Sequence, residues 1–439
     1  MSTAQKQGQA TSSGFHLITI PFADVAATIP TRPSNTPTSR AGAGNNLHAD
    51  ETLCCTASFN THHHSAAELA AALRPPSASS PNPHFSPHDH HHHTDIAITT
   101  SSTDIDHPAF AFSTWLAPLI APSGSSNQGC SAVVVRLPRA FVADVLLPAH
   151  SRWLRTSALP EGLVAALLDD WPGVRDEVER AVAAAAAAAA SAAGRAAAGG
   201  GGGAGGRGAF VRLDACSTKD SALHDAKTPV RSAREVVRAV AGSMRAAGAL
   251  GRWLEATAGG AGGSRAVALC VVPWDARMDA GNEFRVFVPP PPATVRRGKR
   301  QEAAAAAAEG FDDGELKISA ISQYRWCEPL KLQEGLGMDV VGMVEEGAER
   351  LLRKILEVAG WLEWRDKEGK GMLEVLRERG FVFDVAVMPQ KDGGHAVQLV
   401  ELNPFGATTG CGSVLFHWIN DARVLYGLDR REFRVALDR

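Results

Sequence analysis

The sequence lacks an apolar run long enough to cross a bilayer, and it does not begin with the basic-then-apolar pattern of a secretory signal. It also lacks metal-type cysteine spacing, because the only close pair among its seven cysteines is the adjacent Cys54 and Cys55. An odd number of cysteines in a long chain favours free thiols in a reducing compartment. We therefore expect a cytoplasmic protein without a membrane partner.

Neither sign of charge dominates the chain. It contains 44 lysine and arginine residues against 47 aspartate and glutamate residues, which gives a net charge of −3, and its isoelectric point is near 6.6. Such a mixture creates no field that attracts nucleic acid, so we expect no nucleic-acid partner. The length of 439 residues and the apolar content of 45% allow two or three domains. We expect the protein to be a monomer.

Low-complexity stretches define the predicted domain organisation. Residues 1–108 are rich in Ser, Thr, Pro, Asn and His, and we expect them to form a disordered tail whose histidine clusters reflect biased composition rather than a metal site. Residues 177–208, which run from alanine into glycine, and residues 289–315 are predicted to be insertions. The glycine run has no following Gly-Lys-Ser/Thr and is not interpreted as a phosphate loop. An ordered domain then covers residues 109–430, and residues 431–439 form a C-terminal tail.

The most specific pattern is a β-hairpin near the C-terminus. Apolar runs flank Lys-Asp-Gly-Gly at residues 391–394, and Asp-Gly or Gly-Gly between such runs is a strong hairpin signal. A turn centred on Asp-Gly places Asp384 opposite Glu401, and a turn moved by one residue places it opposite Asn403. Side chains alternate with a period of two, so all three lie on one face in either register. An odd-length loop would break this parity.

Asp384, Glu401 and Asn403 are candidate ligands for a divalent cation. Two carboxylates about 5 Å apart across a ladder repel each other unless a cation lies between them, and no nearby Lys or Arg of the hairpin pairs with them. Mg²⁺ is usually held by one or two carboxylates together with phosphate oxygens. The alternative is a solvated polar face on an edge hairpin, which the apolar residues Val400 and Leu402 on the other face disfavour.

The hairpin motifs resemble the cell division cycle protein 123 family. FVFDV at residues 381–385 and VELNPFG at residues 400–406 are similar to the family's Phe-Asp and Asp-Phe-Asn-Pro-Phe-Gly segments, with Glu401 where an aspartate is usual. The resemblance covers scattered blocks between residues 108 and 430. Other matching positions are Phe112, Ser113, Trp115, Leu137, Pro138, Leu415, Phe416 and Trp418.

The resemblance implies a phosphate-contacting strand and loop at residues 209–220. In this alignment Arg212 replaces a lysine that contacts phosphate, Asp214 replaces an asparagine, Lys219 replaces an arginine, and Asp220 is retained. Arginine keeps a permanent cation that can grip phosphate, although it is bulkier than lysine. The alternative for Arg212 is an ordinary strand cation on a solvated face.

The same resemblance implies adenine contacts and a second phosphate cation. The adenine hinge would lie at the end of the apolar strand 266–274, with Val271, Val272 and Trp274. The alternating strand Glu283–Val288 matches the family segment Glu-Phe-Arg-x-Phe-Val, and we assign Arg285 to phosphate binding. A cross-strand salt bridge with Glu283 or another nearby acid is a compatible alternative for Arg285. Gln323 is retained in a further matching strand, residues 316–325.

The implied fold is α+β and ATP-grasp-like, with two α/β lobes whose antiparallel sheets enclose an ATP and Mg²⁺ site. Members of the family act as ATP-binding assembly chaperones for eukaryotic translation initiation factor 2 and bind its γ subunit, so we expect that partner here. A second hypothesis is an ATP-grasp ligase or kinase that activates a carboxylate through an acyl phosphate. A third is a binding module that has lost ATP, against which the three intact hairpin ligands speak.

Overall fold

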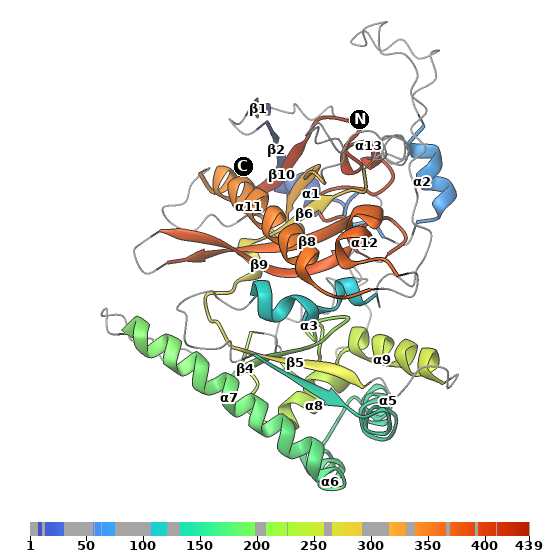
Figure 1. Ribbon diagram of the computed structural model, residues 1–439, viewed down its shortest axis with the longest axis vertical. Helices are drawn as coiled ribbons and strands as arrows, with labels where there is room; N and C mark the ends of the chain where they lie inside the picture. The colour runs from blue at the N-terminus through green and yellow to red at the C-terminus, as the bar shows by residue number, and fades with distance from the viewer. Residues whose placement is uncertain are drawn as a thin grey trace, which may run out of the picture.

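The protein forms two lobes, each built on one β-sheet (Figure 1). This mixed architecture confirms the α+β class. No helix in the described ranges is long and apolar enough to span a membrane. The computed structural model describes residues 8–10, 14–29, 56, 58–62, 64–74, 107–120, 132–197, 208–225, 227–258, 266–291, 316–330, 339–365, 369–390, 394–409 and 411–438.

The larger lobe contains a seven-stranded sheet with the order β1-β2-β10-β7-β6-β8-β9. Its strands are β1 (Gly8–Ala10), β2 (His16–Pro21), β6 (Glu283–Val288), β7 (Ala320–Gln323), β8 (Phe381–Pro389), β9 (His395–Pro404) and β10 (Glu432–Leu437). Strand β10 pairs in parallel with both β2 and β7, whereas the remaining pairs are antiparallel. The prediction of antiparallel sheets is therefore wrong for this sheet. Strand β2 from the N-terminal region and strand β10 from the C-terminal end pair in parallel inside it.

Both faces of the large sheet are buried. Helices α11 (Asp339–Trp361) and α12 (Met372–Arg379) pack on Phe381 and Phe383 of β8 (Figure 1). On the other face, Val382 packs with Trp418 and with residues of α1 (Phe22–Ala26), α2 (Ala66–Ala72) and α13 (Ala422–Leu425). Burial on both faces accounts for the nearly continuous apolar sequence of β8.

Both chain ends therefore differ from the sequence-based prediction. Within residues 1–108, β2 pairs with β10, and Leu69 of α2 is buried in the core. Residues 431–439 are not a free tail, since Phe433 and Val435 of β10 are both 0% exposed. Strands as short as β2 and β10 are stabilised mainly by their neighbours in the sheet, and a local pattern cannot reveal those neighbours.

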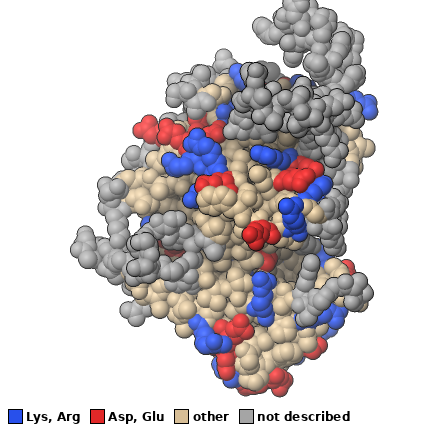
Figure 2. Space-filling view, viewed as in Figure 1, with Lys and Arg blue, Asp and Glu red and all other residues tan. Residues whose placement is uncertain are grey.

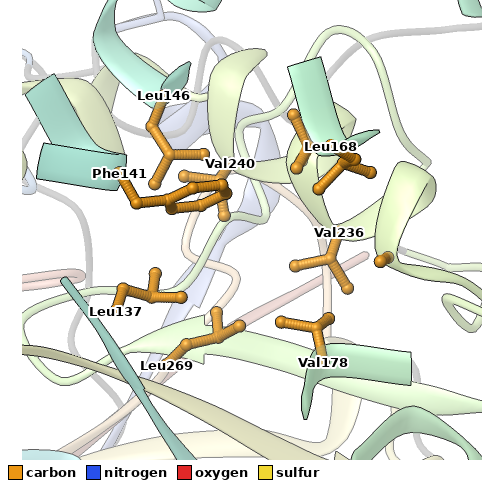
Figure 3. A pocket seen from close by; sticks show the side chains of 10 residues that line it. Leu137, Phe141, Leu146, Leu168, Val178, Val236, Val240 and Leu269 are labelled. Carbon is orange, nitrogen blue, oxygen red and sulfur yellow. The ribbon is translucent and has the colours of Figure 1, made fainter. Parts of the chain in front are cut away.

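The smaller lobe contains a three-stranded antiparallel sheet with β5 (Val267–Pro273) between β3 (Val133–Leu137) and β4 (Ala209–Leu213). Helices pack on one face of it, and their apolar side chains, together with Leu137 of β3 and Leu269 of β5, surround a void of about 10 Å³ (Figure 3). A void of this size with an apolar lining stays dry and is too small for a ligand. The helices of this layer are α4 (Arg139–Phe141), η5 (Val142–Leu146), α5 (Leu147–Thr156), α6 (Glu161–Asp169), α7 (Pro172–Ala197), α8 (Ala233–Ala241) and α9 (Met244–Thr257).

The predicted insertion at residues 177–208 is partly a structural helix. Helix α7 continues through the alanine run, and Val178, Val182 and Ala185 are buried in the core of the smaller lobe. Alanine has the highest helix propensity, and its small side chain permits close packing against a sheet. The glycine run at residues 198–207 and most of the second predicted insertion, residues 292–315, lie outside the described residues.

A short helix joins the two lobes. Helix α3 (Phe112–Trp115), which carries the Phe-Ser-x-Trp match, lies between β5 and β9 (Figure 1). Trp115 is fully buried in the core of the larger lobe. The Phe112 N–H donates to the Asp214 carbonyl oxygen of the smaller lobe at 3.3 Å. The first residues of the predicted ordered domain thus fix the two sheets relative to each other.

The position of β10 in the sheet predicts a large effect of Phe433→Ala. The Phe433 ring is 5.7 Å from the Phe284 ring, centroid to centroid, and is fully buried. We expect its truncation to lower the free energy of unfolding by about 3–5 kcal/mol, measured by urea denaturation. Arg430→Ala, at an exposed position just before the strand, should change it by less than about 0.5 kcal/mol. Equal, small effects of both substitutions would show that the C-terminus is a tail after all.

Candidate functional site

Charged side chains from both lobes meet where β4 of the smaller lobe approaches the end of β9. The closest link is an ion pair between Arg212 of β4 and Glu401 of β9, with 2.5 Å between Nη1 and Oε2. The other members from the smaller lobe are Lys219 and Arg245. The larger lobe contributes Arg285, Tyr324, Asp384 and Asn403.

The hairpin brings Asp384 opposite Glu401, as predicted, but its loop length and strand register differ from the predicted ones. Pro389 pairs with His395, which leaves an odd-length loop, residues 390–394, and would by itself place Asp384 opposite Val400. A β-bulge between Asp384 and Val385 shifts the register by one residue and restores the pairing with Glu401. Bulges recur next to functional sites because they re-aim side chains. The predicted turn itself, residues 391–393, lies outside the described residues.

Arg285 and Asp384 form a buried cross-strand ion pair. They lie directly opposite each other on β6 and β8. Nε and Nη2 of Arg285 donate to Oδ1 and Oδ2 of Asp384, each at 2.8 Å, and Nη1 donates to the Gly412 carbonyl oxygen at 2.8 Å. The structure therefore shows the salt-bridge alternative for Arg285, with Asp384 as the partner.

Arg212 is likewise buried and is not a cation on a solvated face. Its guanidinium carbon lies 4.2 Å from the centroid of the Phe112 ring, and its side chain is only 6% exposed. Asn403 completes the group around the acids, since its side-chain amide donates to Glu401 at 3.2 Å and to Asp384 at 3.5 Å. Each of the two carboxylates thus has an arginine partner, Arg285 for Asp384 and Arg212 for Glu401.

The two carboxyl groups differ in their pKa. Burial raises the pKa of Asp384, and the ion pair with Arg285 only opposes that rise. Burial also acts to raise the pKa of Glu401, but the positive charges of Arg212, Lys219 and Arg245 outweigh it and hold the pKa far below its usual range. Glu401 is therefore the more firmly ionised of the two acids.

Two more cations face the acids. The Lys219 ammonium donates to the Tyr324 hydroxyl and lies 4.1 Å from the centroid of the Tyr324 ring. Arg245, in the first turn of α9, interacts electrostatically with Glu401, Tyr324 and Asp220, and within the described parts of the chain its guanidinium has no hydrogen-bond partner. The sequence pattern does not point to Arg245, because a continuous amphipathic pattern runs across Gly242, where α8 ends and α9 follows.

Three predicted nucleotide-site residues are engaged in holding the fold. Asp214 accepts hydrogen bonds from the backbone and hydroxyl of Ser113 at 2.7 and 3.0 Å. Asp220 accepts from the Ser243 hydroxyl at 2.6 Å and from the Arg245 backbone at 3.1 Å, and so fixes the start of α9. Gln323 accepts from the Ala436 backbone at 2.8 Å, which ties β7 to β10.

The predicted adenine hinge lies at the end of the central strand β5. Val271 pairs with Val133 on one side and Val211 on the other, and Val272 pairs with Phe210. The Trp274 N–H donates to the Gly208 carbonyl oxygen at 3.1 Å. Val271 is therefore paired with a strand on each side, and the backbone of the predicted hinge is largely hydrogen-bonded within the smaller lobe.

The donor set fits a hard divalent cation that takes some ligands from elsewhere. Each carboxylate offers about four lone-pair sites, and the contacts with Arg212, Arg285 and Asn403 use only part of them. Among the residues that the structure describes, no cluster of three His, Cys, Asp or Glu side chains could hold an ion alone. That combination suits Mg²⁺, which keeps water or phosphate oxygens in its shell.

The visible surface charge is mixed. On the face shown in Figure 2, Lys and Arg are interspersed with Asp and Glu, without an extended area of one sign. That face therefore offers no extended positive area to a polyanion.

Comparison with known proteins returns solved structures only. No protein-family model matches the chain, and no curated protein matches it. The structure is similar to that of Cdc123 from Schizosaccharomyces pombe, with 16% sequence identity, a TM-score of 0.41, and coverage of 78% of this chain and 99% of that one. A C-terminally truncated Cdc123 from the same organism gives 16% identity, a TM-score of 0.43, and coverage of 77% and 98%. These neighbours are from the family that the hairpin motifs resemble.

The depressed pKa of Glu401 predicts a pH-dependent effect of Glu401→Gln. The folded pKa lies below the unfolded value of about 4.3, so the stabilisation is complete above that value and is lost as the pH falls toward the folded pKa. At pH 7 we expect a loss of about 1–3 kcal/mol in the free energy of unfolding, because Arg212 is left buried without its counterion. Urea denaturation at pH 7 and pH 3.5 measures it, with the exposed Glu255→Gln as control. A loss that stays constant or grows toward pH 3.5 would contradict the assignment.

Proposed function

We propose that the junction between the lobes binds ATP together with Mg²⁺, in an ATP-grasp-like arrangement. The observation that carries this proposal is the convergence of Arg212, Lys219 and Arg245 from one lobe on Glu401 and Asp384 of the other. Cations and acids in one buried cluster suit a ligand that carries negative phosphates and a bound cation at once. Phosphate binds arginine and lysine, and Mg²⁺ binds carboxylates.

Asp384, Glu401 and Asn403 are the residues that would hold Mg²⁺. Bound there, the ion would neutralise phosphate charge. Arg285 keeps Asp384 in place through two hydrogen bonds at 2.8 Å, so the carboxylate is oriented before any ligand arrives. Asn403 bridges the two acids through its amide nitrogen, and its amide oxygen is the third candidate ligand.

Lys219 and Arg245 give the site its positive excess. Arg212 and Arg285 are balanced by Glu401 and Asp384 in direct ion pairs. Lys219 bonds to a neutral tyrosine hydroxyl, and the Arg245 guanidinium faces the acids without a hydrogen bond within the described residues. Cations placed beside the two acids in this way would complement the terminal phosphates of a nucleotide.

Calorimetric titration of ATP, with and without Mg²⁺, tests the proposal. We expect magnesium-dependent binding by the wild type and a loss of about tenfold or more in affinity for Arg245→Met, since a charge-assisted contact contributes about 1.5–3 kcal/mol. Arg245→Met removes no side-chain hydrogen bond of the described fold, so we expect it to lower stability less than the loss of the Arg212–Glu401 ion pair would. Arg155→Met, at an exposed position of α5, is the matched control.

Asp384→Ala is a poor probe of metal binding in this protein. It removes the partner of the buried Arg285, which costs about 3–5 kcal/mol of stability, so lost binding could reflect unfolding. Failure of the folded wild type to bind ATP at any Mg²⁺ concentration would refute the nucleotide proposal outright. Equal affinities of wild type and Arg245→Met would remove Arg245 from it.

We further propose that the nucleotide-bound protein acts as an assembly chaperone that binds the γ subunit of eukaryotic translation initiation factor 2. The motif resemblance supports the partner, and the geometry supports a role for the nucleotide. The candidate contacts come from both lobes, and the Arg212–Glu401 ion pair links them. A ligand held by both lobes would fix their relative orientation and hence any surface that spans them.

Binding to the purified γ subunit tests the chaperone role. We expect the wild type and Arg155→Met to bind it more tightly with ATP and Mg²⁺ than without, because the nucleotide orders the lobes. Arg245→Met should lose most of that nucleotide-dependent gain, measured by biolayer interferometry. Absence of γ-subunit binding together with ATP consumption in the presence of a carboxylic acid acceptor would favour the ligase hypothesis instead.

A further inference from the structure

A segment from the N-terminal region lies against the loop that follows the hairpin. We call residues 58–62 and 64–74 the strap; it includes α2. Leu69 of the strap packs in one core cluster with Trp418 and Phe405, and the His64 N–H donates to the Ala407 carbonyl oxygen at 3.0 Å. Figure 1 places α2 beside α13 at this end of the larger lobe. The strap is thus joined to the loop by apolar and polar contacts.

Gly412 connects this loop to the candidate site. Its carbonyl oxygen accepts the third hydrogen bond of Arg285, whose other two go to Asp384. A Cβ atom at Gly412 would lie 2.2 Å from Oδ1 of Asn60 in the strap. The absence of a side chain at this position therefore lets the strap approach the backbone that Arg285 uses.

Asn60 holds the loop in a strained conformation. Val414 has a φ of +50°, which is rare and costly for a β-branched residue and persists only when its surroundings impose it. The Val414 N–H donates to Oδ1 of Asn60 at 3.2 Å, and the Val414 carbonyl oxygen accepts from the Asn60 N–H at 2.7 Å. Asn60 also has a φ of +50°, which asparagine tolerates better than most residues.

Thr61 makes the second attachment. Its carbonyl oxygen accepts hydrogen bonds from the backbone and the hydroxyl of Ser413, at 3.3 and 3.2 Å. The Thr61 hydroxyl oxygen accepts a hydrogen bond from the backbone N–H of Trp418 at 2.9 Å. Ser413 is fully buried, so in the folded protein its polar groups depend on protein partners such as Thr61 rather than on water.

We propose that the strap is a positioning element for the site, and that Asn60 sets the orientation of Arg285 and Asp384 through the loop that carries Gly412. Asn60 reaches the ion pair only by way of the loop backbone, so it is a positioning residue and not a ligand contact. The order of coupling runs from Asn60 to Val414, then to Gly412, Arg285 and Asp384.

Cysteine labelling tests the coupling without any ligand. Cys411 adjoins Gly412, and burial raises the pKa of its thiol to about 11, so alkylation by iodoacetamide should be slow in the wild type. Asn60→Ala removes the side-chain acceptor and adds strain at positive φ. We expect it to raise the labelling rate of Cys411 about tenfold, the factor for the loss of one buried hydrogen bond of about 1.4 kcal/mol. Peptide mass spectrometry gives the rate for each cysteine.

A second cysteine and matched variants distinguish local release of the loop around Cys411 from unfolding of the whole protein. Cys270, fully buried in β5 of the other lobe, should keep its wild-type rate. Asn60→Asp retains an oxygen acceptor and should keep Cys411 protected, and Ser58→Ala, at an exposed strap position, should do the same. If Asn60→Ala does not fold, Asn60→Gly removes the acceptor without the steric cost of positive φ. Unchanged labelling of Cys411, or an equal rise at Cys411 and Cys270, in the folded acceptor-free variant would overturn the proposal.

A second readout rests on the proposed nucleotide function. We expect Asn60→Ala to weaken magnesium-dependent ATP binding about tenfold in calorimetry, and Asn60→Asp to restore it, because the loop would again hold Arg285. If the wild type does not bind ATP, the proposed function fails while the labelling contrast still decides the coupling. If ATP binds equally to wild type and Asn60→Ala, the strap does not position the site.

Discussion

The buried ion pair between Arg285 and Asp384 is the interaction on which the rest of the site depends. It crosses two neighbouring strands of the large sheet and ends on the carbonyl oxygen of Gly412. A buried pair of this kind adds little net stability, but losing one member is costly because the other charge remains desolvated. The main effect of the pair is therefore on geometry, because it holds the Asp384 carboxylate in one position at the junction of the lobes.

The second ion pair, between Arg212 and Glu401, spans the lobes and gives the junction its electrostatic character. Arg212, Lys219 and Arg245 together keep Glu401 ionised despite its burial. The same cations would attract phosphate, so the charges that hold the ligand-free junction together are also the ones that a nucleotide would use. Nucleotide binding and lobe orientation are coupled in this account because they share these side chains.

The local sequence pattern predicted the hairpin and its polar face. Features that depend on contacts between distant parts of the chain were not predicted. Period-two alternation correctly placed Asp384, Glu401 and Asn403 on one face, although a bulge and an odd-length loop, two unpredicted features, compensated for each other. The alternating strand around Arg285 also appeared as expected, because its apolar and polar faces are both explicit in the sequence.

Most of the missed features depend on partners far away in the chain. Strand β10, EFRVAL, alternates like β6, but its place in the large sheet depends on its pairing with β2 and β7. Arg245 joins the site only because a helix breaks at Gly242, and Asn60 matters only because the loop near Val414 lies against it. Composition alone cannot separate such a strap from the low-complexity residues around it.

The most direct measurement is a crystal structure of the protein grown with Mn²⁺ and a non-hydrolysable ATP analogue, with anomalous data collected to locate the metal. The account predicts a single strong anomalous peak within coordination distance of Asp384 and Glu401, about 2.0–2.3 Å, with phosphates against Lys219 and Arg245. A nucleotide and metal bound elsewhere, with both arginine-carboxylate pairs unchanged and the junction empty, would contradict it.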